Sequence, residues 1–339
     1  MARIGLIYDL FEDYPWKPGE PVDADAEYEP PETVDALEQA LITLGHTAVR
    51  VGTAYDLLRK LDGLRLDAAV NITEAAHSRN REAYALVLLE MAGIPAVGSD
   101  ALTMSLSLDK AWTKDLAVAA GVRTPSYRVY GSGDAVDADD LPGRFPLFVK
   151  PRYEGSSKGI TESSRVESVD ELIREVAWMT ATYSQDAIVE VFLEGGEYTV
   201  GVIGNGPPEA LPVLPRAVDV ETGIGIHALE HRGMPERDIE YEVRGSLTPE
   251  LEAALQRDAI TIYEKLECLD FARIDFRLDS EDEPSFLEIN PLPTFAPDGT
   301  FAIIAEMMNR SYNDFLAEIL DRALRRVGVE RPAGVMVTR

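Results

Sequence analysis

The sequence predicts a mixed α/β protein in which a parallel βαβ domain is followed by two α+β regions. Three observations favour this fold class. Short apolar strands alternate with amphipathic helices in the N-terminal third of the chain. The alternation ends near Lys110, after which we expect antiparallel strands with helices packed on them. Two strands of alternating polar and apolar residues then flank an acidic turn near the C-terminal end.

The N-terminal alternation predicts the elements of the first domain in order. The expected strands are residues 3–9, 47–51, 68–72 and 96–98. The expected helices between them are residues 32–44, 55–61 and 81–92. A long segment rich in Pro, Asp and Glu, residues 10–31, precedes the first helix, and Gly45 ends that helix. No G-x-G-x-x-G follows the first strand, so a dinucleotide-binding domain is excluded.

After Lys110 the expected elements are spaced more widely. They are the helix 110–120, the strands 126–130 and 146–150, the helix 249–266, the strands 271–278 and 285–290, and the helix 312–327.

Composition excludes several classes of function. The 339 residues include 32 Lys and Arg but 60 Asp and Glu, which gives a formal net charge of −28 at pH 7. Nucleic acids and anionic membranes select basic surfaces, so neither is an expected partner. The single cysteine, Cys268, excludes an intrachain disulfide, and the chain contains neither a long apolar run nor a basic and apolar leader. We therefore expect a cytoplasmic protein.

Lysine is scarce among the basic residues, with 7 Lys against 25 Arg. An acid-rich, lysine-poor surface suits a cytoplasm of high ionic strength, because salt screens repulsion among carboxylates. A GC-rich genome also raises Arg over Lys without any salt, so both explanations stay open.

The strongest local signal is the pair of strands near the C-terminal end. Arg273 and Asp275 lie two residues apart, as do Glu288 and Asn290, so one face of each strand is polar. If the turn pairs the strands, these side chains converge, and the residues between them face a core: Ile274, Phe276, Leu287 and Ile289. Two carboxylates and an amide oxygen are hard ligands suited to Mg²⁺. An ordinary half-solvated hairpin is the alternative.

A second signal is Lys150, at the end of a strand, followed by a Gly-Ser-Ser-Lys-Gly loop at residues 155–159. A lysine on a strand can reach phosphate oxygens, and such a loop lets backbone N–H groups approach a phosphate closely. The order of Gly, Lys and Ser differs from that of a Walker A loop. Taken alone, the segment is more typical of a plain hairpin turn.

A third signal is the segment 189–200, which predicts a strand, a hinge with two glycines and another strand. Glu190 precedes the hinge and Glu197 follows it. A base and a sugar could be held there, although a domain linker has the same composition.

The order of these motifs is more informative than any one of them. Residues 98–110, Lys150 with its loop, the segment 190–197 and the two polar strands follow one another at compatible spacings. This order resembles the D-alanine:D-alanine ligase branch of the ATP-grasp superfamily, over roughly residues 4–324. The resemblance implies a three-domain ATP-grasp fold with ATP held between the second and third domains. The implied domains are residues 1–105, 106–193 and 194–328, with a tail at 329–339.

The resemblance also implies a role for each candidate residue. The expected ATP-binding residues are Lys110 and Lys150 on the phosphates, Gly155, Ser156, Ser157 and Gly159 in the lid over them, Glu190 at the adenine amino group, Phe192 and Leu193 in the hinge, and Glu197 on the ribose. The expected ligands of two Mg²⁺ ions, for which Mn²⁺ could substitute, are Asp275, Glu288 and Asn290. The expected catalytic residues are Ser156, Glu288 and Arg273, the last as the oxyanion stabiliser. Ordinary alternatives are a solvated Lys110 and a sheet-face charge at Glu190.

The reaction implied is the ATP-dependent joining of a carboxylate to an amine. The carboxylate attacks the γ-phosphate to give an acylphosphate and ADP, and the amine then displaces phosphate to form an amide. Metal ions and lysines neutralise charge on the transferring group. Amino acids or other small carboxylates and amines are therefore the expected substrates, and the resemblance implies a homodimer. The four histidines, at positions 46, 77, 227 and 231, have no metal-ligand spacing.

The sequence departs from the family pattern around the substrates. Ligases that make D-alanyl-D-alanine continue after Asn290 with Thr-x-Pro-Gly-Met-Thr and a serine that binds the acceptor carboxylate, whereas here that serine position falls at Gly299. Phe295 adds bulk to this loop, so we expect a differently shaped acceptor pocket. Residues 71–74 (Asn-Ile-Thr-Glu) replace a His-Gly motif, and the acidic segment 10–31 replaces a loop with a substrate-binding glutamate.

A third phosphate-binding lysine is also missing, and His231 or Arg232 is its expected replacement. We therefore expect a carboxylate–amine ligase with an acceptor other than D-alanine. A genuine D-alanine:D-alanine ligase with a diverged loop stays open, as does an ATP-binding regulatory protein without chemistry. Arg273 argues against the regulatory protein, because binding nucleotide alone needs no oxyanion arginine.

Overall fold

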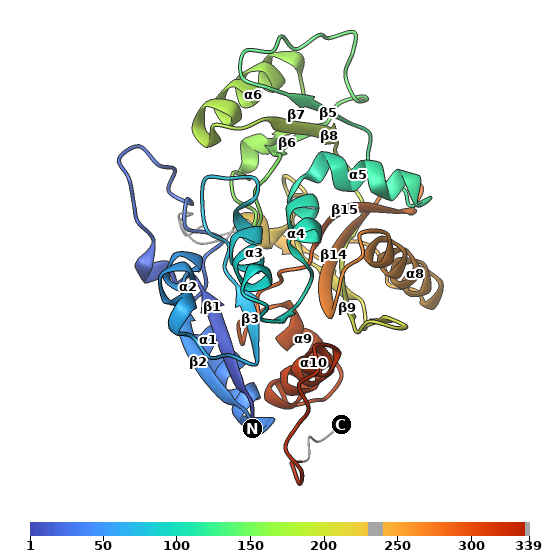
Figure 1. Ribbon diagram of the computed structural model, residues 1–339. Helices are drawn as coiled ribbons and strands as arrows, with labels where there is room; N and C mark the ends of the chain where they lie inside the picture. The colour runs from blue at the N-terminus through green and yellow to red at the C-terminus, as the bar shows by residue number, and fades with distance from the viewer. Residues whose placement is uncertain (230–239, 336–339) are drawn as a thin grey trace.

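A parallel four-stranded sheet forms the N-terminal domain, as the sequence predicts (Figure 1). The structure, a computed structural model, describes residues 1–229 and 240–335. The strand order is β2-β1-β3-β4, and every residue of the inner strand β3 is buried, as expected for a sheet covered on both faces. The strands are β1 Arg3–Tyr8, β2 Thr47–Gly52, β3 Ala68–Ile72 and β4 Ala96–Val97, and the helices are α1 Pro31–Thr43, α2 Ala54–Lys60, α3 Tyr84–Met91 and α4 Ala101–Leu108.

The central domain is an antiparallel sheet covered on one face by a helix. Its strand order is β5-β8-β6-β7. Leu172, Val176 and Met179 of α6 pack on Leu147 and Val149 of β6, so this helix covers the face that points away from the third domain. The elements are α5 Lys110–Ala119, β5 Tyr127–Tyr130, β6 Leu147–Pro151, β7 Arg165–Val166, α6 Val169–Tyr183 and β8 Ala187–Val191.

The C-terminal region contains a second antiparallel sheet. Its order is β10-β9-β14-β15, and β11 also pairs with β9. Its apolar face packs on α8, where Leu255, Ala259 and Ile262 share a core with Ile274 and Phe276. The elements are β9 Glu197–Ile203, β10 Glu209–Ala210, β11 Leu214–Arg216, β12 Val218–Asp219, α7 Ile226–Leu229, β13 Tyr241–Glu242, α8 Pro249–Lys265, β14 Phe271–Leu278, β15 Pro284–Asn290, α9 Thr300–Met307 and α10 Tyr312–Arg326.

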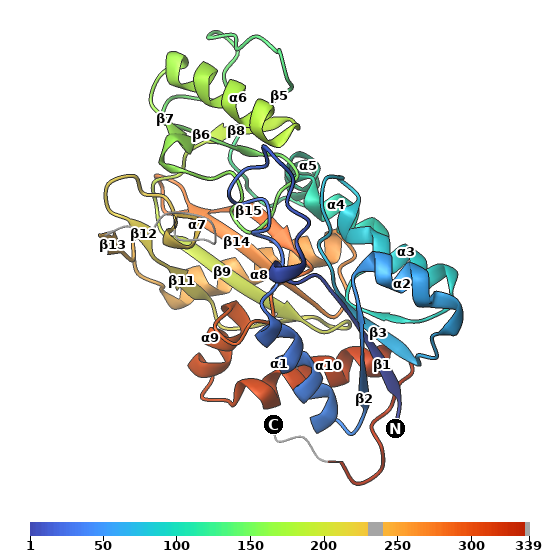
Figure 2. The same ribbon diagram turned by 90° about the vertical axis from the view of Figure 1, so that its left-hand side faces the viewer.

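The last two helices return to the N-terminal domain, and Figure 2 shows α10 beside α1. Leu316 and Leu320 of α10 and Phe301 of α9 share one core with Leu37 and Leu41 of α1. The domain boundaries inferred from the sequence therefore remain predictions, since this core draws on both ends of the chain. Within the described residues, every helix is too short or too polar to cross a bilayer.

The sequence pattern assigns no helix to four segments that are helical here, α4, α6, α7 and α9. Capping residues would have indicated two of them, because the Asp100 side chain accepts a hydrogen bond from Thr103 N (2.8 Å) and the Ser168 side chain accepts one from Glu171 N (3.4 Å). The expected helix 81–92 is divided, since a 3₁₀ turn at Arg81–Ala83 precedes α3. Other 3₁₀ turns are Phe11–Asp13, Leu61–Gly63 and Glu162–Ser164.

Candidate active site

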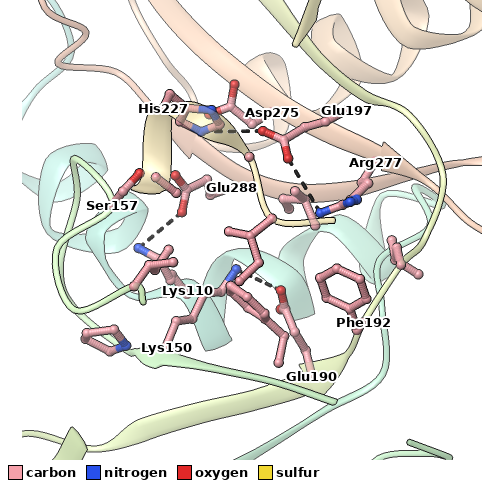
Figure 3. A pocket seen from close by; sticks show the side chains of 18 of the residues that line it. Lys110, Lys150, Ser157, Glu190, Phe192, Glu197, His227, Asp275, Arg277 and Glu288 are labelled. Carbon is pink, nitrogen blue, oxygen red and sulfur yellow. Dashed lines mark ion pairs between the residues drawn. The ribbon is translucent and has the colours of Figure 1, made fainter. Parts of the chain in front are cut away.

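The sheets of the central and C-terminal domains contribute opposite walls of one cavity (Figure 3). Strands β6 and β8 supply one wall, and β14 and β15 supply the other. The expected site residues that line it are Lys110, Lys150, Ser157, Glu190, Phe192, Leu193, Glu197, Asp275 and Glu288. A smaller pocket adjoins it, sharing Lys110, Glu154 and Glu288, and is also lined by Gly155, Ser156 and Asn290. Arg232 and His231 lie outside the described residues.

The register of the C-terminal hairpin confirms the predicted convergence of polar side chains. Arg273 pairs with Asn290, and Asp275 pairs with Glu288. Residues directly opposite in an antiparallel pair point to the same face. The other face is the core, where the buried side chains are Ile274, Phe276 and Ile289.

Leu287 departs from this alternation. The register shifts after Asp275, so that Phe276 pairs with Phe286 and the strand contains a β-bulge. Leu287 consequently lines the cavity and is only half-buried. The expectation that Leu287 faces the core is wrong, because one extra residue reverses the side to which it points.

Asp275 and Glu288 each have a cationic partner. Asp275 accepts hydrogen bonds from Thr199 Oγ1 (2.6 Å) and Arg273 Nε (3.1 Å). Glu288 Oε2 lies 3.2 Å from Lys110 Nζ. Burial would raise the pKa of Glu288, but the positive charges of Lys110, Lys150 and Arg273 outweigh it and lower that pKa to about 2.

The donor set fits Mg²⁺. Asp275 and Glu288 offer ionised oxygens from neighbouring strands, and Asn290 adds an amide oxygen, which already accepts a hydrogen bond from Leu292 N (2.9 Å) through one of its two lone pairs. Within residues 1–229 and 240–335 no three His, Cys, Asp or Glu side chains gather closely enough to hold a metal by themselves. An ion here would therefore also need the amide, water or substrate phosphate, which matches the usual coordination of Mg²⁺.

A buried glutamate between two lysines forms the opposite wall. Glu190 Oε1 lies 2.8 Å from Lys150 Nζ, and Oε2 lies 2.8 Å from Lys114 Nζ. Burial opposes ionisation of Glu190, yet the two lysines lower its pKa. Burial lowers the pKa of Lys114 to about 8. Sequence reasoning missed Lys114, although it follows Lys110 by one helical turn and so shares its face. The assignment of Glu190 to the adenine amino group remains a prediction.

The hinge between β8 and β9 lies close to the backbone of neighbouring segments. A Cβ at Gly195 would lie 2.6 Å from Leu278 O, and one at Gly196 would lie 2.5 Å from Arg244 O, so only glycine fits at either position. The Phe192 N–H donates to Pro146 O (3.1 Å) and the Gly195 N–H donates to Leu278 O (3.2 Å), whereas the Leu193 N–H has no backbone partner in the described part of the chain.

Glu197 lies between a guanidinium and an imidazole that sequence reasoning missed. Its carboxylate is 3.6 Å from Arg277 Nη1 and 3.4 Å from His227 Nε2. Arg277 continues the alternation begun by Arg273 and Asp275, which was the available signal. Arg216 pairs with Glu197 across β11 and β9, and so points to the same face of the sheet.

The Gly-Ser loop is tied to the N-terminal acidic segment. Gly155 N donates to Glu27 Oε1 (2.5 Å), and Gly159 N donates to Asp23 Oδ2 (2.8 Å). Ser156 and Ser157, between them, have positive φ values of 46° and 58°, which are uncommon for residues with a side chain. The loop therefore takes its shape from residues more than a hundred positions earlier.

A second charge cluster lies behind this loop. Arg81 Nη2 is 2.5 Å from Glu27 and 3.5 Å from Glu154, and Lys158 Nζ is 2.9 Å from Glu154. Glu82, beside Arg81, has a pKa raised to about 7 by burial. This cluster adjoins the smaller pocket, because Glu82 and Glu154 line it.

The loop after Asn290 differs from its expected layout. Phe295 is fully buried and packs edge-on against Phe271, with ring centroids 5.0 Å apart, so it belongs to the core and adds no bulk to a substrate pocket. That part of the acceptor-loop expectation is wrong, because an apolar ring gains more from burial than from exposure in a polar pocket. Thr294 donates to Glu29 Oε2 (2.9 Å), and Gly299, without a side-chain oxygen, precedes α9.

Two antiparallel sheets, with Lys150 on one and magnesium-type ligands on the other, define a nucleotide cleft of the ATP-grasp kind. Solved structures share this fold over nearly the whole chain. A D-alanine–D-alanine ligase from Bacillus anthracis complexed with ATP matches with a TM-score of 0.72 at 22% identity, covering 96% of this chain and 98% of its own. VanG D-Ala:D-Ser ligase from Enterococcus faecalis matches with a TM-score of 0.70 at 19% identity, covering 95% and 99%.

The sequence comparisons narrow the class to a family. The family model described as the D-ala D-ala ligase C-terminus matches residues 134–321. A D-alanine–D-alanine ligase from Aquifex aeolicus is 34% identical over 266 residues, which cover 77% of this chain and 84% of the relative. The chain therefore belongs to the D-alanine–D-alanine ligase family of ATP-grasp ligases, which confirms the resemblance inferred from motif order.

Proposed function

We propose that this ATP-grasp ligase joins a carboxylate to an amine through an acylphosphate and that its acceptor is not D-alanine. One observation carries the chemical part of the proposal. Arg273, Asp275, Glu288 and Asn290 converge on one face of the hairpin, where Lys110 contacts Glu288. An oxyanion ligand and oxygen ligands for a metal thus lie together beside a lysine.

In the first step, a substrate carboxylate oxygen attacks the γ-phosphorus of ATP, and the bond to the β-phosphate oxygen breaks to release ADP. Lys110 and Lys150 neutralise the oxygens of the transferring group. Asp275, Glu288 and Asn290 would hold two Mg²⁺ ions, which would supply further charge neutralisation. Ser156 and Ser157 direct the backbone of the Gly-Ser loop over the phosphates.

In the second step, the amine nitrogen attacks the acyl carbon, and the carbonyl oxygen becomes an oxyanion. Arg273 donates to that oxyanion. Collapse then breaks the C–O bond to phosphate, the amine loses a proton, and an amide results. Asp275 fixes the Arg273 guanidinium through its 3.1 Å hydrogen bond, so this donor is oriented before reaction.

The acceptor part of the proposal depends on Gly299. A serine hydroxyl at this position would donate to the acceptor carboxylate, and losing one hydrogen bond to a charged group costs about 1.5–3 kcal/mol, or roughly ten- to a hundredfold in affinity. Thr294 does not replace it, because its hydroxyl already donates to Glu29. D-alanine should therefore be a poor acceptor.

A competition assay tests this. Purified protein with MgATP receives D-alanine mixed with other L- and D-amino acids, and the products are identified by mass. A product other than D-alanyl-D-alanine should dominate at millimolar substrate. Dominance of D-alanyl-D-alanine would refute the acceptor proposal and establish the alternative, a genuine D-alanine–D-alanine ligase. If none of the substrate pairs causes phosphate release, the regulatory alternative is favoured.

We also propose a homodimer formed through the N-terminal domain. Exposed apolar side chains gather there on α2, α3 and α4, around a groove lined by Tyr55, Leu58, Val87 and Leu102. Such a patch on a protein of net charge −28 favours contact with a second apolar surface. Sedimentation of the protein and of Leu58→Asp should show a dimer and a monomer respectively. A cytoplasmic location stays a prediction.

A further inference from the structure

A second cavity, of about 560 Å³, lies beside the Gly-Ser loop. Its walls come from residues 14–24 of the acidic segment, residues 77–81 after β3, and the end of α6 at Thr182–Ser184. Glu154 and Lys158 line both this cavity and the nucleotide cavity, so the two spaces share a wall. Figure 2 shows the dark blue segment between β1 and α1 reaching toward α6, where Tyr183 donates to Asp23.

Two positive charges in this cavity have no carboxylate partner in the described part of the chain. The Arg79 guanidinium lies over the rings of Trp112 (4.8 Å) and Tyr153 (5.6 Å), and Lys17 Nζ lies 3.2 Å from His77 Nε2. Neither Arg79 nor Lys17 forms an ion pair within residues 1–229 and 240–335. Both side chains are exposed, and the cavity lining as a whole holds four Lys or Arg residues (17, 79, 81 and 158) against three carboxylates (20, 154 and 186). This excess of positive charge favours an anionic ligand.

Aromatic side chains surround the same cavity. The chain has three tryptophans, and each contacts a residue of the cavity wall. Trp16 packs against Tyr14 (5.0 Å), Trp112 lies beneath Arg79, and Trp178 packs against Tyr183 (5.9 Å). These tryptophans are 41–51% exposed, so aromatic surface beside the cavity wall is open to a ligand.

We propose that this cavity binds the far end of a substrate that carries a second, distal carboxylate, as an acidic amino acid or a short peptide does. The inference rests on the proposed ligase function, since it extends the substrate site across the wall formed by Glu154 and Lys158. Arg79 and Lys17 receive the distal carboxylate, and the aromatic rings cover the chain that leads to it. Alanine is too short to use these contacts.

A kinetic panel tests the substrate class. Phosphate release is measured with MgATP and with alanine, aspartate, glutamate or alanyl-alanine in both D and L forms. We expect at least one substrate with a distal carboxylate to have a KM roughly tenfold below that of alanine, the factor given by one charge-assisted hydrogen bond. Comparing aspartate and glutamate with alanyl-alanine shows whether the preferred distal carboxylate belongs to a side chain or to a peptide terminus.

Variants then locate the contact. Arg79→Ala should raise that KM about tenfold, while kcat, the KM for ATP and the KM for alanine stay unchanged, and Arg79→Lys should restore part of the loss. Arg174→Ala is the matched control, because Arg174 is exposed on α6 and does not line the cavity. Equal effects of Arg79→Ala on alanine and on acidic substrates, or changes below twofold, would overturn the proposal.

Binding without turnover separates this inference from the ligase function. Glutarate should change tryptophan fluorescence in a saturable way, and uncharged glutaramide should not. The glutarate response should be lost in Lys17→Ala combined with Arg79→Ala. A glutarate response in a protein without ligase activity would support the anion site and refute the proposed function. If the protein has ligase activity, shows no fluorescence response to glutarate, and its Lys17 and Arg79 variants leave KM unchanged, the anion site alone is refuted.

Discussion

Glu190 and Glu27 are both buried carboxylates held by two cations, yet their surroundings carry opposite excess charge. Glu190 meets Lys114 and Lys150, so positive charge dominates beside the nucleotide cavity. Glu27 meets Arg81 and Lys158, Glu154 contacts the same two cations, and Glu82 lies 4.0 Å from Arg81, so carboxylates outnumber cations behind the loop. The first environment suits phosphate, whereas the second is a buried network in which the charges pair with one another. The difference predicts that mutations on the first side change turnover, whereas mutations on the second change stability.

The Arg81 cluster should give the largest effect when broken. Arg81→Met leaves Glu82 without a cation partner in the described residues and leaves Glu27 and Glu154 with Lys158 alone, and loss of one partner from a buried pair typically costs about 3–5 kcal/mol. Urea unfolding measures the free energy of unfolding. Arg50→Met is the control, because Arg50 pairs with Asp35 and Glu38 on the surface, where pairs contribute less than about 1 kcal/mol. Equal losses in both variants would contradict the assignment of a buried network.

A mutation beside the nucleotide cavity should reduce turnover and leave stability nearly unchanged. Glu288→Gln removes a shared metal ligand and should reduce phosphate release roughly a hundredfold, with a smaller change in nucleotide affinity. The assay uses saturating Mg²⁺ and a parallel nucleotide titration. Glu283→Gln, an exposed position in the same hairpin, should leave both quantities unchanged. Retention of more than about a tenth of the wild-type rate would contradict the metal assignment.

A third buried carboxylate, Glu175 on α6, has no cation partner in the described residues and sharpens the comparison. Burial raises its pKa from 4.5 to about 7, and its Oε1 has no hydrogen-bond partner there either. The folded state favours the protonated acid, so the stability that Glu175 retains at low pH is lost as pH rises from about 4.5 through 7.

Glu175→Gln cannot ionise and should therefore melt at a higher temperature than the wild type at pH 8, with little difference at pH 4.5. Glu264→Gln, an exposed change on α8, serves as the control. A melting-temperature gain that is the same at both pH values would show that the effect is not one of ionisation.

Surface charge should give the smallest and most gradual effect. If repulsion at a net charge of −28 limits stability, the melting temperature should rise with KCl, because the Debye length falls to about 3 Å at 1 M. An uncharged osmolyte controls for general stabilisation. A flat curve would leave genome composition as the explanation for the scarcity of lysine.

The polar residues of the hairpin beside the nucleotide cavity are predictable from the sequence because they lie on strands. Two-residue spacing alone places Asp275 and Glu288 on the polar faces of their strands, and the same rule extended one step further finds Arg277. The orientation of Leu287 is not predictable, since the bulge that redirects it depends on pairing between strands.

The cluster behind the loop is not predictable from the sequence. Glu27 and Arg81 are 54 residues apart in segments without regular periodicity, and only tertiary packing brings them together. Phe295 is misplaced by sequence reasoning for a related reason, because a loop sequence does not state which side chains face the core.

The hydrogen bonds from Gly155 and Gly159 to Glu27 and Asp23 have a kinetic consequence. Their partners lie 128 and 136 residues away in the sequence, so the loop cannot lift from the cleft while residues 23–27 stay in place. The two amide protons should exchange with solvent at one shared rate, set by release of the N-terminal segment. Departure of ADP would then wait for that segment, so its rate would depend on Asp23 and Glu27, which do not line the nucleotide cavity.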